Sequence, residues 1–271
     1  MTHARYFVGA PRRPEIRHDN GFLGQFPRRN ATWADRRSLA KWQGRLELAE
    51  AVQGVPGAPK NDIPDALAAY RHFLKGRGAA RTFSYERYVA NDASGRTTLQ
   101  SAILEAMAAA YTLHTSAAPE GGTFSFTGSA IGCGGTNGSF PYPATENWQK
   151  AIGAHSIWIS GDVVVKVPKP SGSKSSGPTP PGTPQFTLTL VVHAEDRYNF
   201  NPGAADIATG IPDDANGVFE LTGLAKQYMN NATLTRRIAW SGAPAASFTV
   251  SMAPWLRQRQ PRDNRRLRNR L

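Results

Sequence analysis

Cysteine, acidic residues and long apolar runs are scarce in this 271-residue chain. Its single cysteine, Cys133, excludes an internal disulfide and any metal site that needs several thiolates. No stretch approaches the roughly 20 consecutive apolar residues that a membrane-spanning helix needs. The first ten residues contain no apolar block long enough for a secretory signal. We therefore expect a chain that is cytoplasmic as synthesised, and that leaves the cell by a dedicated secretion machine or by lysis if it is exported.

The net charge of +12 is concentrated at the two ends of the chain. Residues 1–45 hold ten basic and three acidic side chains, and residues 254–271 hold seven arginines and one aspartate. The chain between them is close to neutral, so it has no bias toward polyanions. An extended basic arm over 1–31 and an arginine-rich tail over 254–271 are therefore predicted.

The tail is a candidate nucleic-acid contact because arginine pairs well with phosphate oxygens. A solvated, partly disordered chain end is the alternative interpretation. The arginines concerned are Arg257, Arg259, Arg262, Arg265, Arg266, Arg268 and Arg270.

Apolar residues recur at three- and four-residue steps through the region 32–116, which predicts helices. One helix is expected from Asp35 to Val52, and a second from Asp62, with Pro64 in its first turn, up to Gly76. A third is expected after a cap at Ser94 or Thr97. The N-terminal half is therefore predicted to be helical.

The region 117–253 changes to a two-residue alternation that is typical of strands. Apolar residues alternate through 157–167 and again through 186–192, and strands are also expected over 234–240 and 248–252. A Ser/Gly/Pro-rich loop over 168–184 joins two of these strands, and a short helix is expected over 218–229. The predicted fold class is α+β, with a helical N-terminal half and a C-terminal antiparallel sheet that holds one helix.

The segment from His193 to Gly217 is the part of the chain that is richest in reactive side chains. It begins where an apolar strand ends, which is where rigid folds often present functional groups. His193 can move a proton near neutral pH, and Asp196 and Asp206 can accept protons or bind a hard cation. The alternative is a purely structural segment of turns, in which these side chains only satisfy backbone amides or face solvent.

Side chains in and near this segment could hold a phosphate or another polar substrate. Arginine forks match phosphate oxygens, and asparagine amides offer both donors and acceptors. The substrate-binding candidates are Arg197, Asn199, Asn201, Arg236 and Arg237.

The run Asp196-Arg197-Tyr198-Asn199-Phe200-Asn201 resembles the Asp-x-Tyr-Asp signature of colicin M-type bacteriocins. More loosely, the stretch from Trp148 to Trp240 resembles C-terminal domains of uncharacterised bacterial secreted toxins. The colicin M resemblance implies an α/β phosphodiesterase that cuts a lipid-linked cell-wall precursor with help from a divalent cation, such as Mg²⁺ or Ca²⁺. It also implies catalytic roles for Asp196 and Tyr198.

This sequence departs from the family pattern at two places. Asn199 replaces the second aspartate of the signature, and Ala204-Ala205-Asp206 stands where the family has a His-Arg pair. The departure removes a carboxylate and a proton carrier, so His193 would have to supply the proton from the other side of the motif.

These observations lead to two hypotheses about function. In the first, the chain is an antibacterial toxin or secreted effector that acts on a phosphate-bearing substrate, as a metal-assisted phosphodiesterase if it is an enzyme, with an immunity or delivery protein as its partner. In the second, it is a non-enzymatic structural or assembly protein whose basic arms contact nucleic acid.

Overall fold

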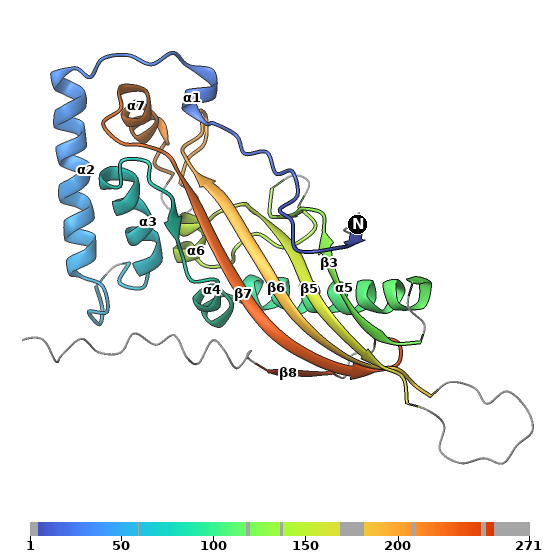
Figure 1. Ribbon diagram of the computed structural model, residues 1–271. Helices are drawn as coiled ribbons and strands as arrows, with labels where there is room; N and C mark the ends of the chain where they lie inside the picture. Colours follow the sequence, from blue (N-terminus) through green and yellow to red (C-terminus); the bar gives the residue numbers. More distant parts are fainter. Residues whose placement is uncertain are drawn as a thin grey trace, which may run out of the picture.

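The computed structural model describes residues 5–58, 60–117, 120–135, 138–168, 182–206, 210–244 and 248–251. A long, strongly bent sheet forms the body, and helices cover one of its faces and gather at one end (Figure 1). The helices are α1 (Phe22–Gln25), α2 (Trp33–Ala51), α3 (Pro64–Lys75), α4 (Tyr85–Asn91), α5 (Ala93–Ala117), α6 (Glu146–Ala151) and α7 (Asp214–Thr222). The strands are β1 (Tyr6–Val8), β2 (Arg81–Thr82), β3 (Gly122–Gly128), β4 (Ile131–Cys133), β5 (His155–Lys166), β6 (Gln185–Tyr198), β7 (Tyr228–Ser241) and β8 (Thr249–Ser251).

The sheet has the strand order β1-β3-β5-β6-β7-β2, and β4 and β8 pair with β5 and β7 outside this path. Strand β6 pairs antiparallel with β7 in a regular register along its whole length, from Gln185 opposite Ser241 to Tyr198 opposite Tyr228, and with β5 from Gln185 to Glu195. Because no bulge interrupts this register, successive side chains of β6 alternate strictly between the two faces.

Two apolar clusters support the sheet. The larger lies between the sheet and α4 and α5, where Leu188, Leu190 and Ile238 are fully buried. Each such aliphatic side chain stabilises the fold by about 1.5–3 kcal/mol. The smaller joins α2, α3 and α7 to the end of the sheet where β6 stops and β7 begins, around Phe73 and Phe219.

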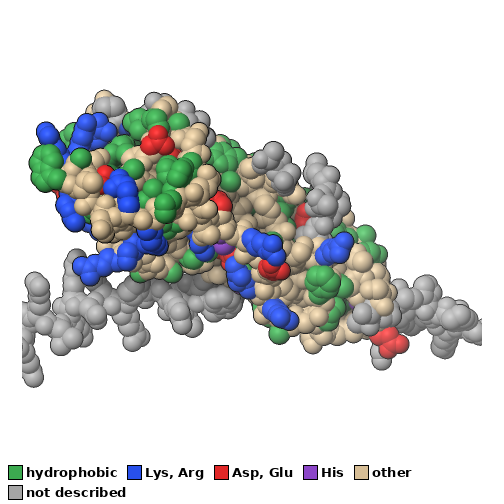
Figure 2. Space-filling model, turned by 90° about the horizontal axis from the view of Figure 1, so that it is seen from above, with side chains coloured by type: hydrophobic (Ala, Val, Ile, Leu, Met, Phe, Trp, Pro, Cys, Tyr) green, Lys and Arg blue, Asp and Glu red, His purple; other side chains and the backbone are tan. Residues whose placement is uncertain are grey.

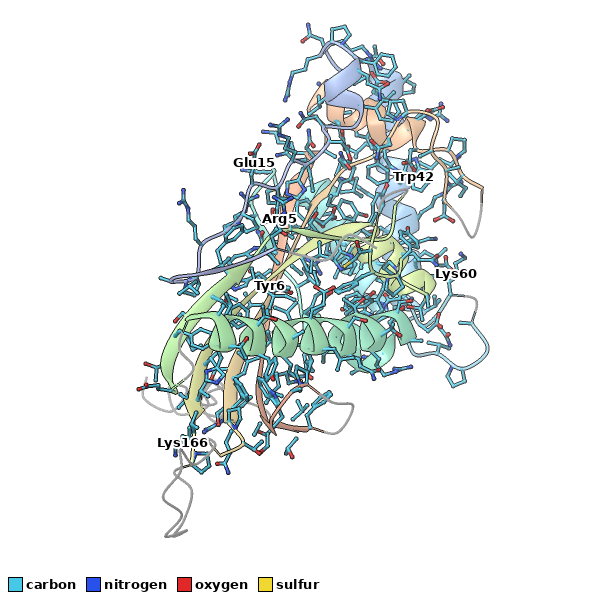
Figure 3. The ribbon with its side chains drawn as sticks, turned by 90° about the vertical axis from the view of Figure 1, so that its right-hand side faces the viewer. Arg5, Tyr6, Glu15, Trp42, Lys60 and Lys166 are labelled. Atoms are coloured by element: carbon cyan, nitrogen blue, oxygen red, sulfur yellow. The ribbon has the colours of Figure 1, made fainter. Side chains whose placement is uncertain are left out.

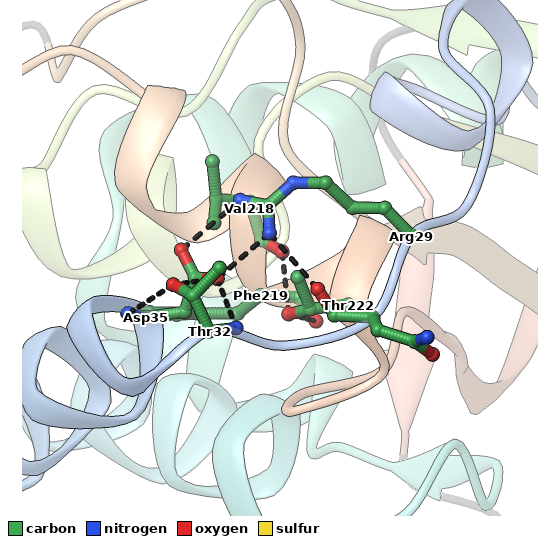
Figure 4. A network of polar contacts seen from close by, with 7 residues as sticks. Arg29, Thr32, Asp35, Val218, Phe219 and Thr222 are labelled. Atoms are coloured by element: carbon green, nitrogen blue, oxygen red, sulfur yellow. Dashed lines mark hydrogen bonds and ion pairs between the residues drawn. The ribbon is translucent and has the colours of Figure 1, made fainter.

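Helix α2 begins at a well-formed cap. The Thr32 hydroxyl accepts from the Asp35 amide at 3.2 Å, and the Asp35 carboxylate accepts from the Thr32 amide at 2.8 Å. Arg29 also donates two hydrogen bonds to Asp35, at 2.7 and 3.0 Å (Figure 4). Hydrogen bonds from Arg29 and Thr32 hold the pKa of Asp35 well below its usual range.

The α+β class predicted from the sequence is confirmed, and the helices expected after Asp35, Asp62 and Ser94 are α2, α3 and α5. The sheet is mixed rather than wholly antiparallel, because β2 pairs parallel with β7. The helix expected over 218–229 is α7, which starts earlier and ends before Gly223, whose left-handed φ of 70° caps it. From Tyr228 onward the chain belongs to β7.

The predicted basic arm lies against the sheet. Strand β1 pairs with β3, and the chain then runs past Glu15 to α1 (Figure 3). We call residues 9–22 the N-terminal strap. Most of the predicted 168–184 loop and all of the arginine-rich tail lie outside the described residues.

Candidate functional site at the end of strand β6

The last four residues of β6 send their side chains to opposite faces of the sheet. Ala194 is buried in the larger core, so by alternation Asp196 and Tyr198 lie on that same, helix-covered face. His193, Glu195 and Arg197 lie on the other face. The structure therefore does not bring His193 together with Asp196 and Tyr198, which the sequence had suggested as one catalytic group.

Tyr198 is held by aromatic packing. Its ring stacks on Tyr228 with centroids 5.1 Å apart, and it contacts Phe73 at 6.1 Å and Phe200 at 5.8 Å. Burial raises the pKa of Tyr198 well above its usual value, with the neighbouring Tyr228 hydroxyl adding to the effect. Its phenol is therefore a neutral hydrogen-bonding group at physiological pH.

Asp196 lies beside Tyr198 and is surrounded by protein atoms while retaining some exposure. Burial raises the pKa of Asp196 well above its usual range, and the negative charge of Asp19 on the strap raises it further. A carboxyl group in this condition holds its proton more tightly than one in water. It can therefore act as a proton donor near neutral pH.

Asp196 and Asp206 both lie near the phenol of Tyr142. Burial raises the pKa of Tyr142, and the charges of these two aspartates raise it further, so all three groups share one environment. Asp206 also forms an ion pair with Lys150 of α6 at 2.7 Å, and Lys150 binds Glu146 at 2.6 Å. The charges of Asp196 and Asp206 thus act on one phenol, and neither Tyr142 nor Lys150 was selected from the sequence.

The loop after β6 folds back on itself to place Asp206. The Asn201 amide donates to the Asp213 carboxylate at 3.1 Å, and the Asp213 amide donates to the Ala204 carbonyl at 3.0 Å. The Asp206 amide donates to the Ile211 carbonyl at 2.9 Å, which closes a tight turn. The Asn201 backbone thus anchors the loop.

The positively charged Arg81 lies on the core face, separated from Asp196 by strand β7. Asn230 lies opposite Asp196 on β7 and opposite Arg81 on β2, and the Arg81 guanidinium donates to the Asn230 amide oxygen at 3.2 Å. The Arg81 charge also acts on Tyr198, where it opposes the rise in pKa. We call Asp196, Tyr198, Tyr142 and Asp206 the core-face cluster. Arg81 is thus a positive group close to this cluster.

The opposite face of β6 is covered by the N-terminal strap. His193 stacks flat on Trp158, with centroids 3.6 Å apart, and its Nε2 lies 2.9 Å from the Ser160 hydroxyl. Burial lowers the pKa of His193 to about 4, so this imidazole is neutral at pH 7. Glu195 is buried, and Arg13 and His18 of the strap bind its carboxylate.

The remaining predicted substrate-binding residues are spread out. Arg197 donates to the Asn20 side chain, and Asn199 donates to the Asp19 carboxylate, so both bind the strap. Arg236 is buried on the core face and binds Glu86 at 2.7 Å, whereas Arg237 is exposed on the other face. Arg236 pairs with Leu190, six residues before Asp196, which separates the two positions by about 20 Å along the strand.

Neither a metal centre nor a membrane span is found in the part of the chain that the structure describes. Within it, no group of three or more His, Cys, Asp or Glu side chains could hold a metal ion, and Lys150 already neutralises Asp206. These residues do not fit the divalent cation that the colicin M resemblance implies. No helix of the described residues is both long and apolar enough to cross a membrane.

The predicted nucleic-acid contacts in the tail, from Arg257 to Arg270, lie outside the described residues and stay a prediction. The basic arm at the other end is partly neutralised within the protein. Arg13 binds Glu195, and Arg29 binds Asp35.

The sequence matches no family profile and no curated protein. Among solved structures, the chain is similar to PaeM, a colicin M-like bacteriocin produced by Pseudomonas aeruginosa, with 17% sequence identity and a TM-score of 0.33. The match covers 74% of this chain and 58% of PaeM, so the chain spans less than two thirds of its length. The resemblance is weak at the level of the whole structure.

Proposed function

We propose that the chain is an antibacterial toxin or secreted effector that acts on a phosphate-bearing substrate at the core-face cluster of β6. The observation that supports this proposal most directly is the environment of Asp196. Burial and the charge of Asp19 raise its pKa, and the charges of Asp196 and Asp206 both act on Tyr142. Strongly perturbed ionisable groups of this kind cluster at functional sites.

In the proposed hydrolysis, a water oxygen forms a bond to phosphorus as the bond from phosphorus to the leaving oxygen of a phosphate ester or anhydride breaks. Asp196 donates its proton to that leaving oxygen, and the proton released by the water passes to the product phosphate or to solvent. A leaving oxygen that gains a proton does not build up negative charge, which lowers the barrier. Arg81, which binds Asn230 opposite Asp196, supplies positive charge that suits a phosphate group, whereas the charge of Lys150 is already balanced by Asp206 and Glu146. Tyr198 packs beside Asp196 and fixes the geometry of the strand end.

The biological setting is also a proposal. The motif resemblance favours a lipid-linked cell-wall precursor as substrate, and an immunity protein would protect the producing cell from such an activity. Delivery by a dedicated machine or release by lysis would bring the chain to its target.

Growth assays test this function. The chain is expressed in bacterial cytoplasm and, separately, behind an added export leader, as wild type and as Asp196→Asn. The wild type is expected to impair growth in at least one compartment, and Asp196→Asn is expected to abolish the effect because the amide has no acidic proton to donate. Asp162→Asn is the matched control, since Asp162 is an exposed carboxylate of β5 far along the sheet. Its toxicity should equal that of the wild type.

Two results would count against the proposal. One is normal growth with the wild type in both compartments. The other is full toxicity of Asp196→Asn. Thermal unfolding of each purified variant shows whether a loss of toxicity reflects chemistry or a damaged fold.

A further inference from the structure

A second polar site lies where α1, the end of β6 and the start of β7 meet. A cleft of about 400 Å³ opens there, and four of its lining side chains are basic: Arg28, Arg77, Arg197 and Lys226. They come from four separate segments of the chain, namely the region after α1, the turn after α3, β6 and the segment before β7. Basic side chains are also spread over the face seen in Figure 2, where acidic ones are sparse.

Three of these cations are available for a ligand. Arg28, Arg77 and Lys226 are exposed, and no acidic side chain within the described ranges forms an ion pair with any of them. Arg77 also has a positive φ of 55°, which is uncommon for a residue with a side chain. The local backbone thus holds an unpaired charge at the cleft in a conformation that most residues avoid.

The floor of the cleft contains a buried acid that is only half satisfied. Glu220 of α7 is 1% exposed, and its Oε1 accepts from the Phe200 amide at 3.2 Å. Its Oε2 is buried and finds no hydrogen-bond partner among the described residues, and the same holds for Oε1 of Gln227, which also lines the cleft. Buried polar atoms are normally paired, and a protonated Glu220 carboxyl would be a donor rather than a second bare acceptor beside Gln227.

We propose that this cleft binds a phosphate group through its basic side chains, with Glu220 lining it as a protonated, neutral acid. Burial raises the pKa of Glu220 to about 8, and the nearby charges of Asp19 and Asp213 contribute to this rise. The acid is therefore mostly neutral at pH 7 and does not repel an anion. Arg197 and Asp196 point to opposite faces of β6, although Tyr228 both lines the cleft and stacks on Tyr198, so the cleft borders the core-face cluster. Phosphate binding in the cleft does not use the proton of Asp196.

Binding to the purified full chain tests the site with two probes. Pyrophosphate represents a small phosphate in solution, and phosphatidylcholine vesicles that contain phosphatidic acid represent a phosphate carried on a lipid. The variant Arg77→Asn/Lys226→Gln removes two charges, and asparagine tolerates the positive φ at position 77. We expect it to bind the preferred probe at least about tenfold more weakly, because charge-assisted contacts are lost.

Lys41→Gln is the control, because Lys41 is an exposed, unpaired cation on α2 outside the cleft. Binding of either probe that the double variant weakens and Lys41→Gln preserves supports the proposal and identifies the source of the phosphate. Binding of neither probe, or an equal loss in the control, overturns it. Asp196→Asn should bind normally, so this result and the growth assays can fail independently.

Glu220→Gln tests the role of the acid. The amide keeps a donor and no longer ionises, so it mimics the protonated side chain. Sulfate is the probe, since its charge stays constant from about pH 6 to about pH 9 while Glu220 ionises over that range. Wild-type affinity should fall severalfold toward the upper end, and Glu220→Gln should remove most of that fall. An identical pH profile for both proteins would refute the role of Glu220.

Discussion

Breaking the contact between the N-terminal strap and β6 should measurably destabilise the protein. Arg13 donates two hydrogen bonds to Glu195, at 2.7 and 2.5 Å, and the Glu195 side chain is 7% exposed while that of Arg13 is 50% exposed. A hydrogen bond to a charged group stabilises a fold by roughly 1.5–3 kcal/mol. Since half of the Arg13 side chain is in water, screening reduces this to about 1–2 kcal/mol for Arg13→Ala.

Arg17→Ala provides a control from the same strap. Arg17 binds Glu15 at 2.8 Å, but the two side chains are 89% and 75% exposed, so losing this pair should cost almost nothing. In a chain of this size, 1 kcal/mol shifts the melting temperature by about 2–4 °C. Arg13→Ala should therefore melt about 2–8 °C below the wild type, and Arg17→Ala should melt with it.

Urea unfolding of Arg13→Ala, Glu195→Gln and the double variant measures the interaction energy between Arg13 and Glu195. The double variant should lose less stability than the two single losses together, because the second change removes a contact that is already broken. Hydrogen bonds from Arg13 and His18 lower the pKa of Glu195 despite its burial. The advantage of the wild type over Arg13→Ala should therefore be present at neutral pH and shrink as the pH falls through this lowered value. Equal melting temperatures for Arg13→Ala and Arg17→Ala, or strictly additive losses, would refute the reasoning.

Three further predictions concern packing, pH and the tail. A Cβ at Gly217 would lie 2.2–2.3 Å from the Phe22 ring, so Gly217→Ala should destabilise the fold by about 1–3 kcal/mol in urea unfolding. Gly44 lies in open space on α2, so the control Gly44→Ala should stabilise the fold by up to about 1 kcal/mol. Burial lowers the pKa values of His155 and His193 to about 4, below the roughly 6.5 of an unfolded chain. These histidines should therefore reduce the free energy of unfolding as the pH falls from about 6.5 toward 4, and His193→Gln should flatten that dependence; an unaltered slope would contradict it. Removing residues 255–271 should abolish most nucleic-acid binding and its dependence on salt if the assembly role is correct, and an unchanged binding curve would argue against that role.

Much of the fold could be predicted from local patterns. The apolar spacing from Leu39 to Val52 indicated α2, and the alternation from Phe186 to Val192 indicated β6, because both reflect which face of one element is buried. Helix α4 was missed because its seven residues are too few to show a period. The parallel pairing of Arg81 with Asn230 joins residues far apart in the chain, and no local pattern reports it.

The candidate site was only partly predictable for the same reason. Sequence reasoning selected Asp196 and Asp206, and both lie near one phenol. It did not select Tyr142 or Lys150, which come from a loop and a six-residue helix elsewhere in the chain. It grouped His193 with Asp196, although the alternation predicted for the strand already implied that residues three apart face opposite sides.

Strand β1 and the strap also affect how the protein folds during synthesis. Residues 6–22 are synthesised well before their partners, which are β3, Glu195 and the Phe200 carbonyl. This segment must therefore wait, without its final contacts, until the chain has been synthesised past Phe200. During that interval Tyr6 and Phe22, which pack against other parts of the finished fold, have no sheet or helix to cover them, so nascent chains of this protein should depend on chaperones more than its final stability would suggest.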